Sequence, residues 1–283
     1  MIELVRKGDK PVVKLNHEDT VPYVSFPMLD EMPEIVHGFS TRLGGVSRDH
    51  LASLNLSFTR GDDPENVREN YRRIAASIGF QPEDMVLSQQ THTTHVYKVT
   101  EGDRGRGFTK PLGYTDIDGL MTNVPGLVLV TSYADCVPLF FVDPVEKVVA
   151  LSHSGWKGTA HRMGKVTVEA MKREYGCRPE NIYAAVGPSI CQDCYEVSED
   201  VFMQIETIIP EEKVPEICYR KEDGKYQMNL WKANELIFLE AGILPEHISV
   251  TDVCTCCNSQ VFFSHRASHG MRGNLSAFLG IRA

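Results

Sequence analysis

The sequence predicts a single domain of the α+β or α/β class, and three observations support that prediction. Stretches with the apolar spacing of helices alternate irregularly with short apolar stretches typical of strands. No Gly/Ser-rich linker and no long run of one charge divides the 283 residues. The spacing Gly-x-x-Pro-Glu-x-apolar occurs three times, each time between a helix-like and a strand-like stretch.

The three copies of that spacing mark the ends of predicted helices. They read GFQPEDM at 79–85, GCRPENI at 176–182 and GILPEHI at 242–248. Glycine suits the left-handed position that ends a helix, and the proline that follows prevents the helix from continuing. Before Gly79, apolar residues share one helical face: Val67, Tyr71, Ile74, Ala75 and Ile78. Further helices are expected over about 159–175, 199–208 and 230–241.

Short apolar stretches follow these helix ends and also lie between them. Strands are expected at 85–88, 96–99, 128–132, 139–142, 148–152, 182–186, 248–251 and 261–264. Polar and sulfur-bearing residues follow many of these strands, at 88–95, 134–138, 152–158, 187–194 and 254–258. Because loops at strand ends converge in space, a site assembled from several of these loops is expected.

Charge and hydropathy exclude several classes of function. The net charge of −9, from 29 Lys+Arg and 38 Asp+Glu, argues against broad binding of nucleic acid or anionic membranes. No apolar run approaches the ~20 residues that cross a bilayer. The N-terminal residues lack the apolar core of a secretory signal, so we expect a cytoplasmic protein. No coiled-coil seam stands out, and we expect a monomer or a weak homodimer.

His92, Cys136 and His153 form the strongest candidate metal site. Two imidazoles and a thiolate suit Zn²⁺, and three protein ligands leave a fourth position for water or substrate. Their spacing alone is a weak signal, and a buried structural role is the alternative for each. Gln90 and Asp135 flank two of them in sequence, where they could hydrogen-bond a bound molecule or cap their loops.

The remaining sulfur chemistry gives weaker signals. Cys191-x-x-Cys194 and the cluster Cys254, Cys256 and Cys257 suggest a four-cysteine zinc site, but the two lie much farther apart than in zinc fingers or ribbons. Ordinary buried thiols are therefore the expected interpretation. A copper oxidase would need His-x-His pairs, which the chain lacks, although Cu²⁺ could occupy an N/S site adventitiously.

Eight ordered motifs together resemble one family. They are HGFSTRLGGVS (37–47), SLNLS (53–57), QTHTTHV (90–96), DIDGLMT (116–122), ADCVPLFFVDP (134–144), HSGWKGT (153–159), VGPSICQDCYEV (186–197) and CTCCNSQVFFSHR (254–266). The set is similar to the YfiH/YlmD, or laccase-domain, family, once labelled polyphenol oxidases or multicopper laccases. The resemblance runs from about residue 38 to the C-terminus and implies one domain over 1–283.

The resemblance implies a purine nucleoside phosphorylase in a compact α+β domain of packed mixed sheets flanked by helices. Such enzymes cleave adenosine, inosine or guanosine with phosphate to the free base and ribose 1-phosphate. They also phosphorolyse methylthioadenosine and deaminate adenosine. The family's metal ligands fall on His92, Cys136 and His153. The chain has no H-x-E motif, so the proton carrier for deamination stays unassigned.

Phosphate requires cations near the metal. Arg42, before Gly44 and Gly45, is the first candidate, with Arg266 and Lys157 as further ones, and Asn55 could bind the nucleoside or order the Arg42 loop. Two positions depart from the family's common pattern. Lys157 stands where arginine is common, which removes a bidentate donor, and Gly273-Asn274 stands where Gly-Arg is common, with Arg272 nearby.

Two other functions remain open at this point. Cys136 as nucleophile with His153 as base would give a cysteine hydrolase or amidase, in keeping with a role of the family in editing peptidoglycan precursors. A non-catalytic protein that binds a metal or a nucleoside is the third hypothesis.

Overall fold

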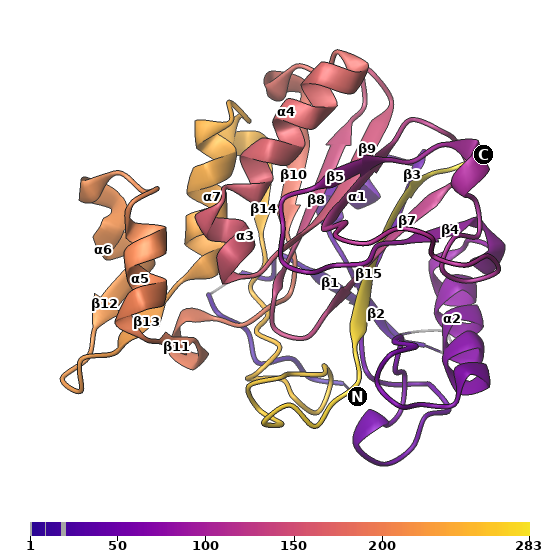
Figure 1. The fold of residues 1–283 in the computed structure, drawn as a ribbon, viewed down its shortest axis with the longest axis horizontal. Coiled ribbons are helices and arrows are strands. Elements are labelled where there is room, and N and C mark those ends of the chain that lie inside the picture. The colour runs from indigo at the N-terminus through magenta and orange to yellow at the C-terminus, as the bar shows by residue number, and fades with distance from the viewer. Residues whose placement is uncertain (1, 9, 18–20) are drawn as a thin grey trace.

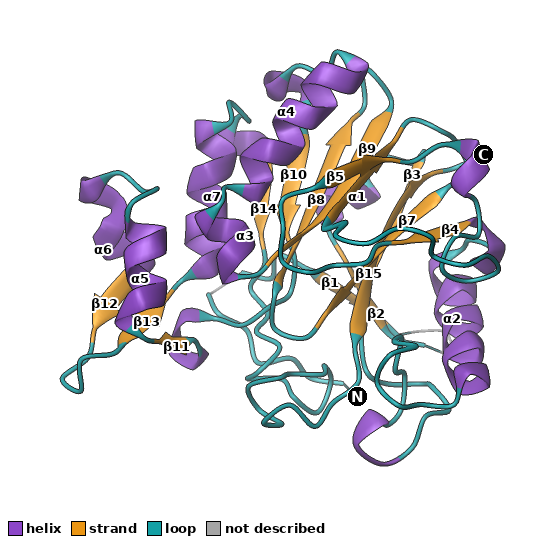
Figure 2. Cartoon of the chain, viewed as in Figure 1, coloured by secondary structure: helices purple, strands orange, loops and turns teal. Residues whose placement is uncertain are grey.

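Two mixed β-sheets pack against each other, and helices cover their outer faces (Figures 1 and 2). The structure, a computed structural model, describes residues 2–8, 10–17 and 21–283. Helix α2 (Pro64–Ile78) covers one sheet, whereas α3 (Trp156–Ala160), α4 (Met163–Tyr175) and α7 (Leu230–Glu240) cover the other. The order of layers is therefore helix, sheet, sheet, helix.

The first sheet has the strand order β1-β2-β3-β15-β7-β4. Its strands are β1 (Lys14–Asn16), β2 (Tyr23–Ser25), β3 (Ile35–Ser40), β15 (Leu275–Ile281), β7 (Val128–Tyr133) and β4 (Met85–Leu87). All neighbours are antiparallel except the parallel pair β4 and β7. The short helix α1 (Pro27–Asp30) lies between β2 and β3.

The second sheet has the strand order β14-β10-β8-β9-β6-β5. Its strands are β14 (Ile248–Val250), β10 (Tyr183–Val186), β8 (Val137–Asp143), β9 (Val148–Ser154), β6 (Gly119–Thr122) and β5 (Val96–Lys98). The two outer pairs are parallel and the inner pairs antiparallel. β8 and β9 are buried along their whole length, because helices cover one face of this sheet and the other sheet covers its opposite face.

A small third sheet lies at one end of the molecule, far left in Figure 1. Its antiparallel strands are β11 (Glu196–Val197), β13 (Tyr226–Met228) and β12 (Cys218–Arg220). Helices α5 (Glu199–Glu206) and α6 (Val214–Ile217) accompany it. This unit packs onto the same apolar core as α4 and α7, so it extends the helical layer rather than the central sheets.

Alternating side chains of β8 show how the core divides. Phe140 packs between the two sheets, whereas Phe141 faces the helices and contacts Phe238 of α7 at 5.2 Å between ring centroids. This division follows from the two-residue period of a strand. On the outer face of the first sheet, Tyr71 and Ile74 of α2 are fully buried in a third apolar cluster.

The three Gly-x-x-Pro-Glu segments end helices as predicted. Gly79 and Gly176 adopt left-handed conformations at φ +95° and +76° directly after α2 and α4, and Gly242 does so at +92° one residue after the cap of α7. A 3₁₀ turn follows each glycine and leads into β4, β10 and β14, respectively.

Two sequence predictions were wrong. The expected strand at 261–264 is a buried turn, in which Val261 and Phe262 donate backbone hydrogen bonds to the carbonyl of Asn258. The helix expected at 159–175 begins earlier and is broken in two at Arg162, which has φ +54°. In both cases the apolar pattern reports burial, and burial alone does not distinguish a strand from a turn or reveal a break between two buried helices. Within the described part of the chain, no helix combines the length and apolarity that a bilayer-spanning segment needs.

Candidate metal centre

Three loops and strand ends bring His92, Cys136 and His153 together. His92 lies between β4 and β5, Cys136 lies in the turn between β7 and β8, and His153 lies near the end of β9. One ligand atom from each residue lies within 4.8 Å of the others, and the two imidazole rings are 4.9 Å apart between centroids. His153 is buried, Cys136 is half-buried and His92 is exposed, so the group is open on one side.

Asp118, which was not among the predicted site residues, organises this group. Its carboxylate accepts a hydrogen bond from His153 Nδ1 at 2.8 Å and from the backbone N–H groups of Thr91, His92 and Thr93 at 2.9–3.1 Å. It therefore fixes the ring of one candidate ligand and the loop of another. Its position in DIDGLMT, one of the recurring motifs, was the available signal.

Burial and neighbouring charges shift the pKa values of Asp118, His153 and His92. Burial raises the pKa of Asp118, but hydrogen bonds from His153, Thr91 and Thr93 outweigh it and lower that pKa to about 2. Burial likewise lowers the pKa of His153, but Cys136 and Asp118 outweigh it and raise the pKa to about 9. Burial and the neighbouring His153 lower the pKa of His92.

The backbone around the group leaves no room for larger residues. A Cβ atom at Gly155 would lie 3.1 Å from both Cys136 Sγ and His92 Nδ1. His92 itself has φ +66°, and Asp135, next to Cys136, has φ +81°. Non-glycine residues adopt such values rarely, and they often do so where function requires it.

The donor set fits a metal ion. A thiolate and two imidazoles suit zinc or copper, and three ligands with an open side leave a coordination position free. The hydrogen bond from His153 Nδ1 to Asp118 leaves Nε2 available, which is the usual arrangement of a carboxylate behind a metal-bound histidine. The space that Gly155 leaves open beside two of the donors is consistent with the same use.

A cavity of about 720 Å³ opens beside the three candidate ligands, all of which line it. Gln90 also lines it, but both ends of its side-chain amide bind the backbone of Ser132, at 2.8 Å each. Apolar surface is provided by Phe58, Leu87, Phe108 and Tyr133.

Arg272 and Arg60 supply positive charge to this cavity. Arg272 Nε is buried and has no hydrogen-bond partner among the described residues. Burial, together with the charge of Arg60, lowers the pKa of Arg272 to about 10. Neither arginine forms an ion pair with a carboxylate within 4.0 Å in the described part of the chain, although the charge of Asp135 acts on Arg272 from farther away. An anion in the cavity would therefore meet net positive charge at this end.

Four of the other predicted substrate residues lie elsewhere. Arg42 donates to the carbonyls of Ala52 and Ser259 and stacks on Phe263, and Arg266 donates to the carbonyls of Cys194 and Glu196. Asn55 is fully buried, and its amide bridges Asp62 and the backbone N–H of Asn274. Asp135 binds Thr255, Ser264 and the Arg266 backbone. None of these four lines the cavity.

Lys157 is exposed at the start of α3. Its ammonium lies 5.6 Å from the centre of the Trp156 ring and affects the pKa of His92 through its charge. It is therefore near the open side of the group without lining the cavity.

Comparison with known proteins gives consistent results. Residues 36–282 match the family described as multi-copper polyphenol oxidoreductase laccase. A purine nucleoside phosphorylase, YlmD, from Geobacillus stearothermophilus is 38% identical over 248 residues, 87% of this chain and 90% of that one. The crystal structure of YlmD from the same species has a TM-score of 0.89, with 34% identity over 97% of this chain and 100% of that chain. An adenosine deaminase from an unknown prokaryotic organism is 34% identical over 82% of this chain and 89% of its own length.

Proposed function

Since this chain belongs to the multi-copper polyphenol oxidoreductase laccase family, we propose that it is a zinc-dependent purine nucleoside phosphorylase. The comparisons confirm the resemblance found in the eight motifs and the α+β fold expected from it. The observation that supports the proposed activity most directly is the position of His92, Cys136 and His153 on the wall of a cavity that Arg60 and Arg272 also line, the latter with an unpartnered Nε.

In the proposed reaction, phosphate displaces the purine from C1′ of the ribose. A bond forms between a phosphate oxygen and C1′, the C1′–N9 bond breaks, and its electron pair leaves with the base, which takes up a proton. Zn²⁺ held by the three ligands would act as a Lewis acid that stabilises charge developing on the substrate. Asp118 keeps the His153 ring oriented and holds the His92 loop in place.

Arg272 and Arg60 are the proposed phosphate site. The unpartnered Nε of Arg272 and the mutual proximity of two guanidinium groups favour an anion at this end of the cavity. Arg272 thereby takes the place of the arginine that the family commonly has where this chain has Asn274. In this proposal Arg42 and Arg266 are structural, because their guanidinium groups hold backbone carbonyls.

The purine is proposed to lie against the apolar side of the cavity. Phe58 and Phe108 offer ring surfaces, and both also contact the Arg68 guanidinium, at 5.7 and 5.5 Å from the ring centres. Stacking and apolar contact would accept adenosine, inosine, guanosine or methylthioadenosine. Adenosine deamination is proposed as a second activity of the same cavity, because one similar relative is an adenosine deaminase.

The test is a chromatographic assay of metal-quantified protein with adenosine and inosine, with and without phosphate. Release of adenine and hypoxanthine should require phosphate and should be abolished in Cys136→Ala. Cys218→Ala is the matched control, because Cys218 is a buried thiol in β12, away from the cavity. Full activity in Cys136→Ala, or no turnover of either nucleoside, would refute the proposal. Conversion of adenosine to inosine alone would make deamination the main activity.

A cysteine hydrolase is the second candidate. The Cys136 thiol lies next to the His153 ring, which is hydrogen-bonded to Asp118, and this is the arrangement of a nucleophile, a base and an orienting carboxylate. The two candidates differ in the reactivity of Cys136. Zinc should protect Cys136 from alkylation if it is a metal ligand. Stoichiometric alkylation of Cys136 in metal-loaded protein would favour the hydrolase.

A further inference from the structure

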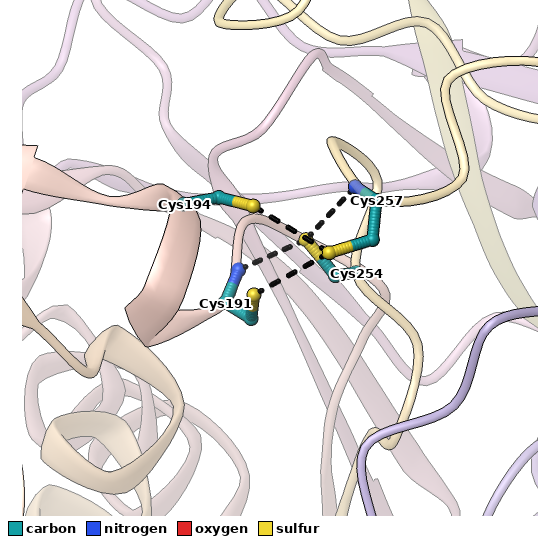
Figure 3. Close-up of side chains that lie close together, drawn as sticks. All are labelled: Cys191, Cys194, Cys254 and Cys257. Atoms are coloured by element: carbon teal, nitrogen blue, oxygen red, sulfur yellow. Dashed lines mark hydrogen bonds between the residues drawn. The ribbon is translucent and has the colours of Figure 1, made fainter.

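Four cysteines outside the cavity meet at one point, contrary to the expectation from their spacing. Cys191 and Cys194 come from the loop after β10, and Cys254 and Cys257 come from the loop after β14 (Figure 3). Each of the four sulfur atoms lies within 4.8 Å of the other three. The residues form two Cys-x-x-Cys pairs, one from each loop.

Sheet topology explains how such distant pairs converge. β10 and β14 are parallel neighbours, so both strands end at the same edge of the second sheet. The pairing continues past the strands through a parallel bridge between Ser189 and Cys254. The loop length between the pairs is irrelevant once the strands that precede them are adjacent, which is why spacing along the chain was a misleading criterion.

The distances match a mononuclear tetrathiolate site. Thiolates about 2.3 Å from a tetrahedral Zn²⁺ lie ~3.8 Å from one another. Cys257 Sγ lies 3.5 Å from Cys194 Sγ and 3.9 Å from Cys191 Sγ. These two distances are close to the tetrahedral value and the other pairs lie within 4.8 Å, so one ion could contact all four sulfurs, whereas a disulfide would join two of them only.

Backbone N–H donors and one cation lie close to the four sulfur atoms. The backbone N–H groups of Cys191 and Cys257 donate to Cys254 Sγ at 3.2 and 3.4 Å, as Figure 3 shows. Lys7 Nζ donates a hydrogen bond of 2.8 Å to Asp193, which lies between Cys191 and Cys194 in the sequence, and its charge interacts with Cys191 and Cys257. This cation would offset part of the negative charge of a four-thiolate site.

We propose that Cys191, Cys194, Cys254 and Cys257 bind one structural Zn²⁺, separate from the candidate metal centre at His92, Cys136 and His153. Four protein ligands leave no open position, which is typical of structural rather than catalytic zinc. Buried thiols with no common ligand would not be expected to gather four sulfur atoms within 4.8 Å of one another.

The proposed zinc fastens the loop that positions Cys136. Ile190, next to Cys191, donates its backbone N–H to the carbonyl of Asp135, and Thr255, next to Cys254, donates its hydroxyl to the Asp135 carboxylate. Asp135 directly precedes Cys136. Both cysteine loops therefore hold the residue before a candidate ligand of the other metal.

The first test counts metal in the purified full-length protein by elemental mass spectrometry. The wild type should contain two zinc ions per chain, and both Cys191→Ser/Cys254→Ser and His92→Ala should contain one. Cys218→Ser is the matched control and should retain two, because its thiol belongs to neither group. Wild-type protein with one zinc that His92→Ala loses, or with iron in place of the second zinc, would overturn the proposal.

A second measurement does not depend on the folding of the Cys191→Ser/Cys254→Ser variant. Wild-type protein reconstituted with Co²⁺ should show intense sulfur-to-cobalt charge-transfer absorption that survives in His92→Ala. Unfolding in a chelator and an alkylating reagent, without reductant, should label all eight thiols. Six or fewer labels would indicate a disulfide and refute the site, as would cobalt absorption that disappears in His92→Ala.

Discussion

Replacement of Asp118 by asparagine changes how the metal ligands are oriented and leaves all three ligands in place. The side chain keeps its size but loses its charge and one of its two acceptor oxygens. One carboxylate oxygen now accepts from His153 and His92, and the other accepts from Thr91 and Thr93. Whichever oxygen becomes the amide nitrogen, two N–H donors lose their acceptor and face another donor.

The size of the effect follows from which of these donors reach water. An unpaired buried donor costs about 1–3 kcal/mol. The amide can turn its oxygen toward His153 and His92, so the donors that lose their acceptor are those of exposed Thr91 and half-buried Thr93. Water can replace much of this contact, and we expect a loss of unfolding free energy of about 1 kcal/mol. Changes behind a metal ligand typically weaken metal affinity 10–100-fold, or about 1.4–2.7 kcal/mol. Metal affinity should therefore change more than stability.

The assay measures transfer of zinc from the protein to a chromogenic chelator. The zinc released from the His92, Cys136 and His153 site is recognised because His92→Ala does not release it. Asp116→Asn is the matched control, since Asp116 lies two residues away from Asp118 and its carboxylate accepts hydrogen bonds from the hydroxyl groups of exposed Thr91 and Thr115. Urea unfolding of each variant measures the stability change. Zinc affinity in Asp118→Asn within about threefold of the wild type would refute the orienting role.

Three further predictions concern separate parts of the molecule. Gly155→Ala should lower metal occupancy, because its Cβ would press on two ligands at 3.1 Å, whereas Gly102→Ala, with its nearest neighbour at 3.6 Å, should leave metal content unchanged. Arg272→Gln should raise the KM for phosphate about 10–100-fold in the phosphorolysis assay, since charge-assisted hydrogen bonds contribute about 1.5–3 kcal/mol, and an unchanged KM would remove Arg272 from the phosphate site. Burial lowers the pKa of His37 to about 4 from 6.5, and its Nε2 accepts the backbone N–H of Phe26. The unfolded chain therefore binds the proton more tightly, and the free energy of unfolding should fall by up to about 3 kcal/mol between pH 6.5 and 4. Over that pH range the urea midpoint should fall less in His37→Gln than in the wild type. An equal fall in both proteins would exclude His37 as the cause.

The parts of the fold that follow local rules could be predicted from the sequence. Helix ends at Gly79 and Gly176 were predictable because a left-handed glycine followed by proline leaves the chain few alternatives. β15 and β3, which pair with each other in the first sheet, were not expected. Their residues are buried on both faces, so they show no alternation, and their pairing depends on contacts between opposite ends of the sequence.

The candidate site likewise has residues that the sequence predicts and residues that it does not. The motifs singled out His92, Cys136 and His153, and the structure brings them together. Charge alone was a poor guide to the anion site: Arg42 lies beside a glycine turn but binds carbonyls, whereas Arg272 lines the cavity. Asp118 was missed because an acidic residue that acts through a histidine has no spacing signature of its own.

The position of β15 also has a consequence for synthesis of the protein. This strand lies between β3 and β7, which precede it by well over a hundred residues, and it pairs with both along its length. Until residues 275–281 leave the ribosome, β3 and β7 have no partner on their facing edges, and the first sheet stays divided. Cys254, Cys257 and Arg272 are also translated late. A nascent chain should therefore expose unpaired strand edges until residues 275–281 have been made, which favours retention by chaperones up to that point and late completion of the four-cysteine site.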